Sequence, residues 1–99
     1  MLHPNDRLQA EIRMLRPEEG RRPIAIQPGY RPHLRVGAAG TYLGVSLAAG
    51  PDRIEPGDSA VVTFELLYEG VDYSPLTVGA RFDILEGPIV VGKGIVLSG

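Results

Sequence analysis

Glycine and proline interrupt this chain so frequently that no long regular element fits between them. The 99 residues include 13 Gly and 9 Pro, distributed along the whole sequence. Both residues destabilise the interior of a helix, glycine through its backbone freedom and proline through its missing N–H and its ring. Short extended segments joined by turns tolerate them better. The sequence therefore predicts an all-β fold.

Alternating hydrophobicity places the expected strands. In residues 8–14 the apolar side chains occupy every second position, and Gln9, Glu11 and Arg13 fall between them. This period of two predicts a half-buried strand. About seven short strands at roughly ten-residue spacing, without a helical period, favour an antiparallel barrel or sandwich. Further strands are expected at residues 33–36, 41–47, 60–70, 80–87 and 88–99, with residues 60–70 forming the longest.

The segments between these strands carry turn signals. Pro56 and Gly57 suit the central positions of a β-turn, where glycine supplies a positive φ. Residues 21–32 contain three prolines, so edge or irregular extended structure is expected there. Residues 72–78 are expected to form a polar loop.

Composition limits the class of protein. A chain of 99 residues without cysteine predicts one domain, residues 1–99, with a modest core and no disulfide or thiolate metal site. There is no apolar run of the roughly 18 residues that a membrane span needs. The first residues are too polar for a signal peptide, so a cytoplasmic location is expected.

Charge is distributed unevenly although the net charge is only −2. Residues 1–35 hold seven Arg and four acids, whereas residues 36–99 hold three bases and eight acids. This asymmetry predicts either a basic and an acidic face or an interleaving of the two halves in the fold. The net charge disfavours a bulk nucleic-acid binder.

The C-terminal stretch "GPIVVGKGIVLSG" (Gly87–Gly99) matches the first seven positions of the P-loop pattern G-x-x-x-x-G-K-[ST]. Gly94 stands where a hydroxyl would hold Mg²⁺, the interior is apolar, and too few residues follow for a helix to form. No nucleotide is expected to bind. We expect instead that Gly92 and Gly94 permit a bend or a close approach, with Lys93 facing solvent.

Residues for catalysis are sparse. His3 and His33 are the only imidazoles, and no serine lies in a nucleophile elbow. No spacing of histidines and acids suggests a metal site. The expectation is a protein that is not an enzyme, with no catalytic residue, cofactor or metal.

Three stretches resemble one family: "EEGRRPIAIQPGYRP", "EPGDSAVVTFEL" and "GARFDILEGPIVVGKGIV". The chain resembles the C-terminal β-barrel, the third domain, of translation elongation factor Tu. That family has an "EEGG" turn, "GYRP", a "PGD" turn with a long strand, "RFAIREG" and a final "VGAGVV" strand, in this order. The resemblance runs from about Leu8 to Val96, and the spacings between residues 18–20, 29–32 and 56–58 match.

This resemblance implies a six- to seven-stranded antiparallel closed barrel without catalytic residues. In the factor, this barrel packs against a second barrel and the GTPase domain, and it touches the T-stem of aminoacyl-tRNA. The present chain begins at Met1 just before the barrel. GTP hydrolysis is therefore not expected from it.

Departures from the family pattern weaken the expectation of tRNA binding. Leu85 and Ile89 stand where the family has basic residues, and binding of a duplex backbone depends on Lys and Arg. Arg22 and Arg31 remain at matching positions, and Arg21 adds a base. For Arg31, pairing with an acid or stacking on a neighbouring ring is the alternative role.

The sequence is consistent with two functional hypotheses. A third possibility is that the chain is a decayed fragment without a function of its own. The first is a stand-alone interaction module that binds a protein partner or self-associates. The second is an RNA-facing module that binds tRNA or the translation machinery through its arginine-rich loop. The candidate contact residues for either partner are Arg21, Arg22, Tyr30, Arg31, His33 and Gly94.

Two further features have alternative interpretations. The loop between Leu67 and Gly79 is about six residues longer than its counterpart in the family, and such an insertion either carries a new function or reflects drift. Tyr42, Tyr68 and Tyr73 are expected to complete the edge of the core rather than to stack on bases.

Overall fold

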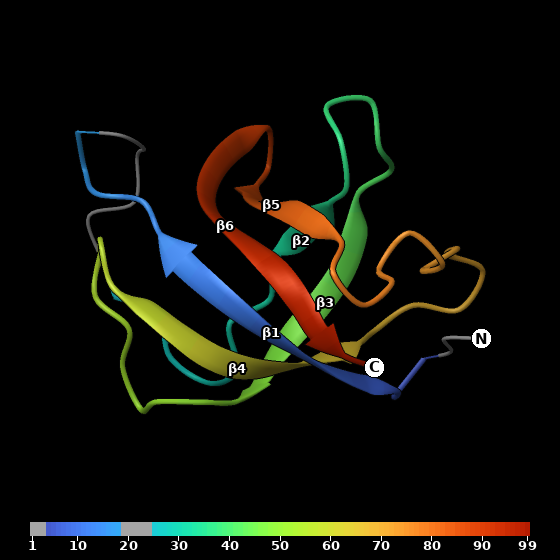
Figure 1. Ribbon diagram of the computed structural model, residues 1–99, viewed down its shortest axis with the longest axis horizontal. Helices are drawn as coiled ribbons and strands as arrows, with labels where there is room; N and C mark the ends of the chain where they lie inside the picture. Colours follow the sequence, from blue (N-terminus) through green and yellow to red (C-terminus); the bar gives the residue numbers. More distant parts are fainter. Residues whose placement is uncertain (1–3, 19–24) are drawn as a thin grey trace.

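The computed structural model describes residues 4–18 and 25–99 of the chain. In these residues six antiparallel strands close into one barrel, in the spatial order β1-β4-β3-β2-β5-β6 (Figure 1). This confirms the predicted all-β class and the closed barrel. The strands are β1 (Arg7–Met14), β2 (His33–Arg35), β3 (Leu43–Ala49), β4 (Ser59–Leu66), β5 (Arg81–Glu86) and β6 (Ile89–Ser98).

Strand β1 follows the predicted alternation. Its side chains at Leu8, Ala10, Ile12 and Met14 are buried in the barrel, whereas Glu11 is exposed. The strand pairs with β4 on one side and with β6 on the other, so its register brings the two ends of the chain together. Closing a sheet in this way removes free strand edges.

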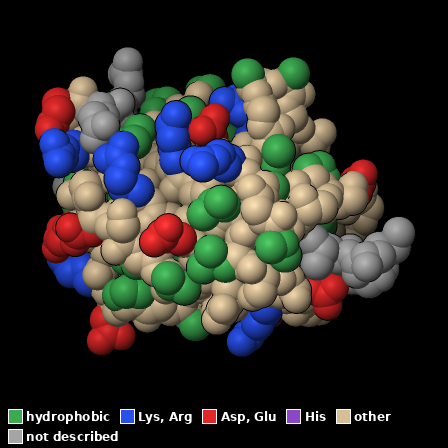
Figure 2. Space-filling view, in the orientation of Figure 1, with side chains coloured by type: hydrophobic (Ala, Val, Ile, Leu, Met, Phe, Trp, Pro, Cys, Tyr) green, Lys and Arg blue, Asp and Glu red, His purple; other side chains and the backbone are tan. Residues whose placement is uncertain are grey.

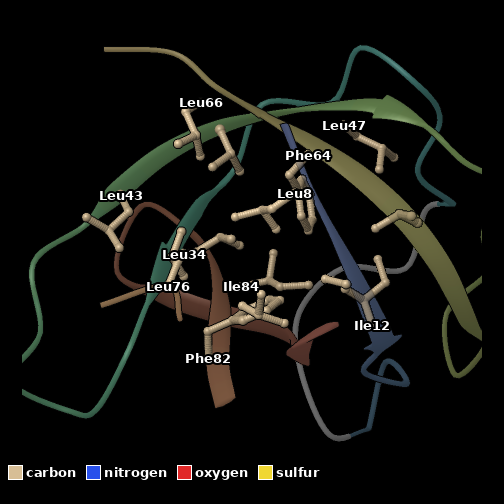
Figure 3. Close-up of a cluster of buried hydrophobic side chains, with 14 of the residues drawn as sticks. Leu8, Ile12, Leu34, Leu43, Leu47, Phe64, Leu66, Leu76, Phe82 and Ile84 are labelled. Carbon is tan, nitrogen blue, oxygen red and sulfur yellow. The ribbon is translucent and has the colours of Figure 1, made fainter. Parts of the chain in front are cut away.

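The inward-facing side chains of all six strands form one hydrophobic core. Figure 3 shows these side chains converging from opposite walls of the barrel. The rings of Phe64 and Phe82 meet edge to face, with centroids 6.3 Å apart, an arrangement that aromatic pairs favour. No polar or charged residue is buried among the described residues, so burial of apolar surface stabilises the barrel.

The prediction that residues 60–70 form the longest strand is wrong. Strand β4 has 8 residues and ends at Leu66, whereas β6 has 10. The chain leaves the sheet there because the hydroxyl of Tyr73 accepts hydrogen bonds from the backbone amides of Leu67 and Tyr68. The Leu67 amide also donates to the carbonyl of Gly44 at 3.3 Å, and the Tyr68 amide, held by the Tyr73 hydroxyl, is the first that leaves the sheet.

Strand β6, whose ribbon is curved in Figure 1, contains two glycines that lie close to neighbouring strands. Gly94 lies between Ile12 and Phe82 on neighbouring strands, and a Cβ atom added to it would lie 2.5 Å from Cζ of Phe82. Gly92 is similarly crowded, with its nearest neighbours at 3.0 Å. The expected close approach at both glycines is confirmed, and Lys93 between them is exposed.

Proline-containing segments connect the strands as expected. Gly57 has φ of +88°, and the amide of Asp58 donates to the carbonyl of Glu55 at 3.0 Å, which closes the predicted turn. Within the described residues 25–32, one isolated bridge joins Ile26 to Ile54. The irregular extended structure predicted for this proline-rich region is confirmed over that part.

The loop that follows β4 closes one end of the barrel. The sequence predicts a polar loop here, but Tyr73 and Leu76 are only 1% and 2% exposed. The Tyr73 hydroxyl donates to the carbonyl of Gly44 at 2.6 Å, which fixes its ring inside the barrel. Apolar burial therefore holds this loop, and Figure 3 shows Leu76 beside the core. In the described residues no helix is long and apolar enough to cross a membrane.

Candidate binding surfaces

The predicted contact residues do not come together as one site. Arg21 and Arg22 lie outside the described residues. Arg31 and His33 precede or begin β2, whereas Gly94 lies on β6, with β5 between the two strands. Gly94 also faces the core, because both of its cross-strand neighbours are buried.

Tyr30 and Arg31 are adjacent in sequence, but only the Tyr30 side chain contacts another strand of the barrel. The Tyr30 hydroxyl donates to Oε2 of Glu86 at 2.5 Å, which links this turn to the end of β5. Arg31 is exposed and forms neither a pair with an acid nor a ring stack in the part of the chain that the structure describes. The alternative structural role considered for Arg31 is therefore not seen, and Tyr30 supplies that link instead.

Outward-facing aromatic side chains lie over β2 and β3. The rings of His33 and Tyr42 are 5.7 Å apart, and the guanidinium of Arg35 lies 5.9 Å from the centroid of Tyr42. Tyr68 covers Gly44, which is the cross-strand neighbour of His33. We call this surface of His33, Tyr42 and Tyr68 the aromatic face.

Two of these tyrosines contradict the expectation that they complete the core. Tyr42 is 39% exposed and Tyr68 is 50% exposed, while Tyr73 alone of the three is buried. Gly44 explains the position of Tyr68, because its missing side chain leaves room for a ring on the outside of the sheet. Sequence alternation alone does not reveal this arrangement, since Tyr68 comes from the loop after β4.

A groove of about 470 Å³ is lined by residues of five strands, β1, β2, β4, β5 and β6. Most of its lining residues come from β1, β5 and β6, while β2 and β4 contribute Arg35 and Ser59. In Figure 2, Lys and Arg side chains gather around an acidic side chain in the upper part of this face. We call this groove the basic groove; its charged side chains are Glu11, Arg13, Arg35, Arg81, Asp83 and Lys93, and its apolar side chains are Ile12, Ala38, Phe82 and Ile95.

Strand register explains why these charges meet. Lys93 is paired with Arg13 on one neighbouring strand and with Asp83 on the other. Asp83 is in turn paired with Arg35, and the two side chains form an ion pair at 3.3 Å. Because outward positions alternate along each strand, all four residues lie on the outer side of the sheet, where Lys93 is exposed and the other three are half-buried. Bases from both halves of the sequence meet here, as the interleaving alternative predicts.

The ion pair leaves the Arg35 guanidinium incompletely satisfied. Its Nη2 contacts Asp83, but its buried Nε has no hydrogen-bond partner in the described structure. Buried donors are normally paired, so this atom is an exception that adds to the polar character of the groove. Arg35 also borders the aromatic face, and it therefore joins the two surfaces.

A second hollow, of about 690 Å³, lies against the loop that closes the barrel. It is lined partly by Val71, Leu76 and Val78. Beside it, the backbone amide of Ser74 donates to Oδ1 of Asp72 at 3.0 Å. This hydrogen bond and one from the Ser74 side chain lower the pKa of Asp72. The arrangement orders the loop and gives no reactive group.

The two departures that weaken tRNA binding lie in different environments. Leu85 is fully buried, so this position offers nothing to a phosphate backbone. A bulge between Ile84 and Leu85 interrupts the pairing of β5 with β6 at this point. Ile89 is 37% exposed at the start of β6, where a basic side chain would have reached solvent.

The fold and the two surfaces define the structural class of this protein. It is a closed six-stranded antiparallel barrel with an aromatic face and a basic groove on its outside. Among the described residues, no group of three His, Cys, Asp or Glu side chains is placed to hold a metal ion. No known protein-family model matches the chain.

Proposed function

We propose that this protein is a non-catalytic interaction module that binds a protein partner through the aromatic face. The observation that carries the proposal is the pair of half-exposed tyrosines, Tyr42 and Tyr68, which flank His33 on the outside of the sheet. Tyrosine and arginine are among the residue types most enriched in binding hot spots, and large exposed aromatic side chains are not otherwise favoured on a surface.

The aromatic face is ordered before any partner arrives. Tyr68 lies against Gly44, and its own backbone amide is held by the hydroxyl of Tyr73. Tyr42 contacts both His33 and Arg35. Side chains that are already fixed lose little entropy when they bind, so more of the contact energy appears as affinity.

The resemblance to the third domain of elongation factor Tu supports the same function. That domain is non-catalytic and packs against other protein domains in the full factor. By this resemblance the barrel offers surface to a partner, which is either another protein or a second copy of the chain.

The alternative is an RNA-facing module that uses Arg21, Arg22 and Arg31. One observation favours it: the exposed Arg31 lies two residues before His33 of the aromatic face, and aromatic rings with nearby arginines also stack on bases. Binding of tRNA at low salt, weakening steeply as salt rises, would support this alternative. The absence of binding at low salt would end it.

Photo-crosslinking in the native cell tests the proposal. Tyr68 is replaced by p-benzoylphenylalanine, an aromatic residue that retains the ring over Gly44. Arg53, an exposed residue in the loop between β3 and β4, carries the same probe as the control. We expect an RNase-resistant adduct at position 68 only, and mass spectrometry should find a peptide of another protein joined to it. A peptide of this same chain would establish the self-association variant.

Two results contradict the proposal. An adduct at position 68 that RNase removes would establish an RNA partner. Equal adduct yields at positions 68 and 53 would show that the aromatic face has no special role. Sedimentation as a monomer at every protein concentration would exclude the self-association variant.

A further inference from the structure

We infer that the basic groove binds an extended acidic segment of the protein partner. The inference rests on the proposed function, because it assumes that the partner is a protein. It adds a second contact surface and the chemistry of the segment that fits there: carboxylate side chains alternating with apolar ones.

The row of charges across the strands sets the dimensions of the segment. Arg35, Lys93 and Arg13 lie on β2, β6 and β1, with Asp83 of β5 between the first two. Adjacent strands are about 4.8 Å apart, so Arg35 and Arg13 are about 14 Å apart along the row. In an extended peptide, side chains on one face repeat about every 7 Å. A segment of about five residues therefore places alternate carboxylates along this row.

A second row offers apolar contact beside the charges. Ile95 is half-buried on the floor of the groove, between Arg81 and Glu11 on the neighbouring strands. The next residue in this row is Val61 of β4, which is 52% exposed. Apolar side chains of the bound segment have a place on Ile95 and Val61, and the burial of both favours binding.

The charge of the groove decides between an acidic peptide and a nucleic acid. Four bases and two acids give the groove a net charge of +2, whereas the other six bases and ten acids of the chain give −4. A phosphate at every nucleotide would place negative charge against Glu11 and Asp83. A peptide with carboxylates on alternate residues brings fewer negative charges to the same row, so it meets Arg35, Lys93 and Arg13 with less repulsion from Asp83 and Glu11. The mixture of charges and the apolar side chains in the groove therefore favour an acidic peptide over a nucleic acid.

Arg35 makes the groove continuous with the aromatic face. Its guanidinium lies near the ring of Tyr42 on one side and contacts Asp83 of the groove on the other. One partner can therefore cover both surfaces. Together they extend over all six strands, since Tyr42 immediately precedes β3 and Val61 belongs to β4.

Fluorescence anisotropy with a defined probe tests the inference. The probe is a fluorescein-labelled short peptide in which glutamate alternates with valine, and a lysine–valine peptide is the matched control. We expect the acidic peptide alone to bind, with affinity falling as salt rises. The double variant Lys93→Glu with Arg81→Glu should weaken binding about tenfold or more. The variant Arg53→Glu reverses one charge outside the groove, half of the total change made by the double variant, and should leave the affinity within about twofold.

Both groove residues are exposed, so the double variant is expected to fold. The neutral pair Lys93→Gln with Arg81→Gln provides a milder change if it does not, and it should weaken binding severalfold. The inference is overturned if the acidic peptide fails to bind, if Arg53→Glu weakens binding as much as the groove variants, or if single-stranded oligouridine binds more tightly than the peptide.

The outcomes separate this inference from the proposed function. If the groove variants bind the peptide normally while crosslinking through position 68 still captures a protein, the groove inference fails and the proposed function stands. If crosslinking finds no protein partner, the proposed function fails, and the inference that rests on it fails as well.

Discussion

Arg35 on β2 and Asp83 on β5 form an ion pair in which Nη2 lies 3.3 Å from Oδ2. Both side chains are mostly buried, with 18% and 28% of their surface exposed. The pair occupies the boundary between the aromatic face and the basic groove, because Arg35 also lies near the ring of Tyr42. Arg35 therefore connects two surfaces that come from distant parts of the sequence.

Removal of the Asp83 charge should strengthen binding of an acidic segment. The variant Asp83→Asn raises the positive charge of the groove and leaves the Arg35 guanidinium available to a carboxylate of the ligand. We expect the glutamate–valine peptide to bind severalfold more tightly. The control is Asp52→Asn, which removes an exposed acid from the loop between β3 and β4. Weaker binding by Asp83→Asn would contradict the role given to Arg35.

A side chain at Gly94 should destabilise the barrel. A Cβ atom there would lie 2.5 Å from Cζ of Phe82 and 2.7 Å from the carbonyl oxygen of Glu11, and the backbone carbonyl cannot move aside easily. We expect Gly94→Ala to lower the free energy of unfolding by about 2–3 kcal/mol. Gly92→Ala, whose nearest neighbours lie at 3.0 Å, should cost less. Urea denaturation measures both, and a larger loss for Gly92→Ala would be inconsistent with this packing.

The Tyr73 hydroxyl should contribute more to stability than any exposed tyrosine hydroxyl. It accepts from two backbone amides and donates to the carbonyl of Gly44. In Tyr73→Phe the Tyr68 amide loses its partner, whereas the Leu67 amide and the Gly44 carbonyl keep the hydrogen bond that they form with each other, so the free energy of unfolding should fall by about 1–2 kcal/mol. The matched control Tyr42→Phe removes an exposed hydroxyl and should change it by less than about 0.5 kcal/mol. Equal effects in chemical denaturation would refute the assignment.

Acid should weaken the local turn between Asp72 and Ser74 in the loop that closes the barrel. Hydrogen bonds from the backbone and the side chain of Ser74 lower the pKa of Asp72 in the folded protein. Their contribution is therefore present above the pKa of Asp72 in the unfolded chain, and it is lost as pH falls through the lower folded value. An NMR titration should show the Asp72 carboxyl and the Ser74 amide changing together. The variant Asp72→Asn should remove that pH dependence, and titration of Asp72 above its ordinary pKa would contradict the account.

Short-range patterns are sufficient to predict the all-β class and the positions of most strands, but they leave open the choice between a barrel and a sandwich. The alternation from Leu8 to Met14, the Pro56-Gly57 turn and the paired glycines of β6 are all seen as expected. Each depends on side-chain period or on local backbone geometry, which neighbouring residues determine. The end of β4 differs from the prediction because it depends on Tyr73, whose hydroxyl reaches back to the amides of Leu67 and Tyr68.

The candidate surfaces depend on strand register, which local sequence patterns do not specify. Lys93 meets Arg13 and Asp83 only because β6 is paired with both β1 and β5. Of the predicted contact residues, His33 lies in the aromatic face and Gly94 lines the groove, although the latter contributes only backbone. The exposed position of Tyr68 requires the empty space over Gly44, a contact between residues distant in sequence.

The most direct test of the account is crosslinking from both surfaces in the native cell. Photoreactive residues at positions 68 and 95 place one probe on the aromatic face and one in the basic groove. If a single partner covers both, the same protein should be joined at both positions, and the peptide captured at position 95 should be rich in acidic residues. Capture of different molecules at the two positions, or of RNA at either, would contradict the claim that these surfaces form one protein-binding site.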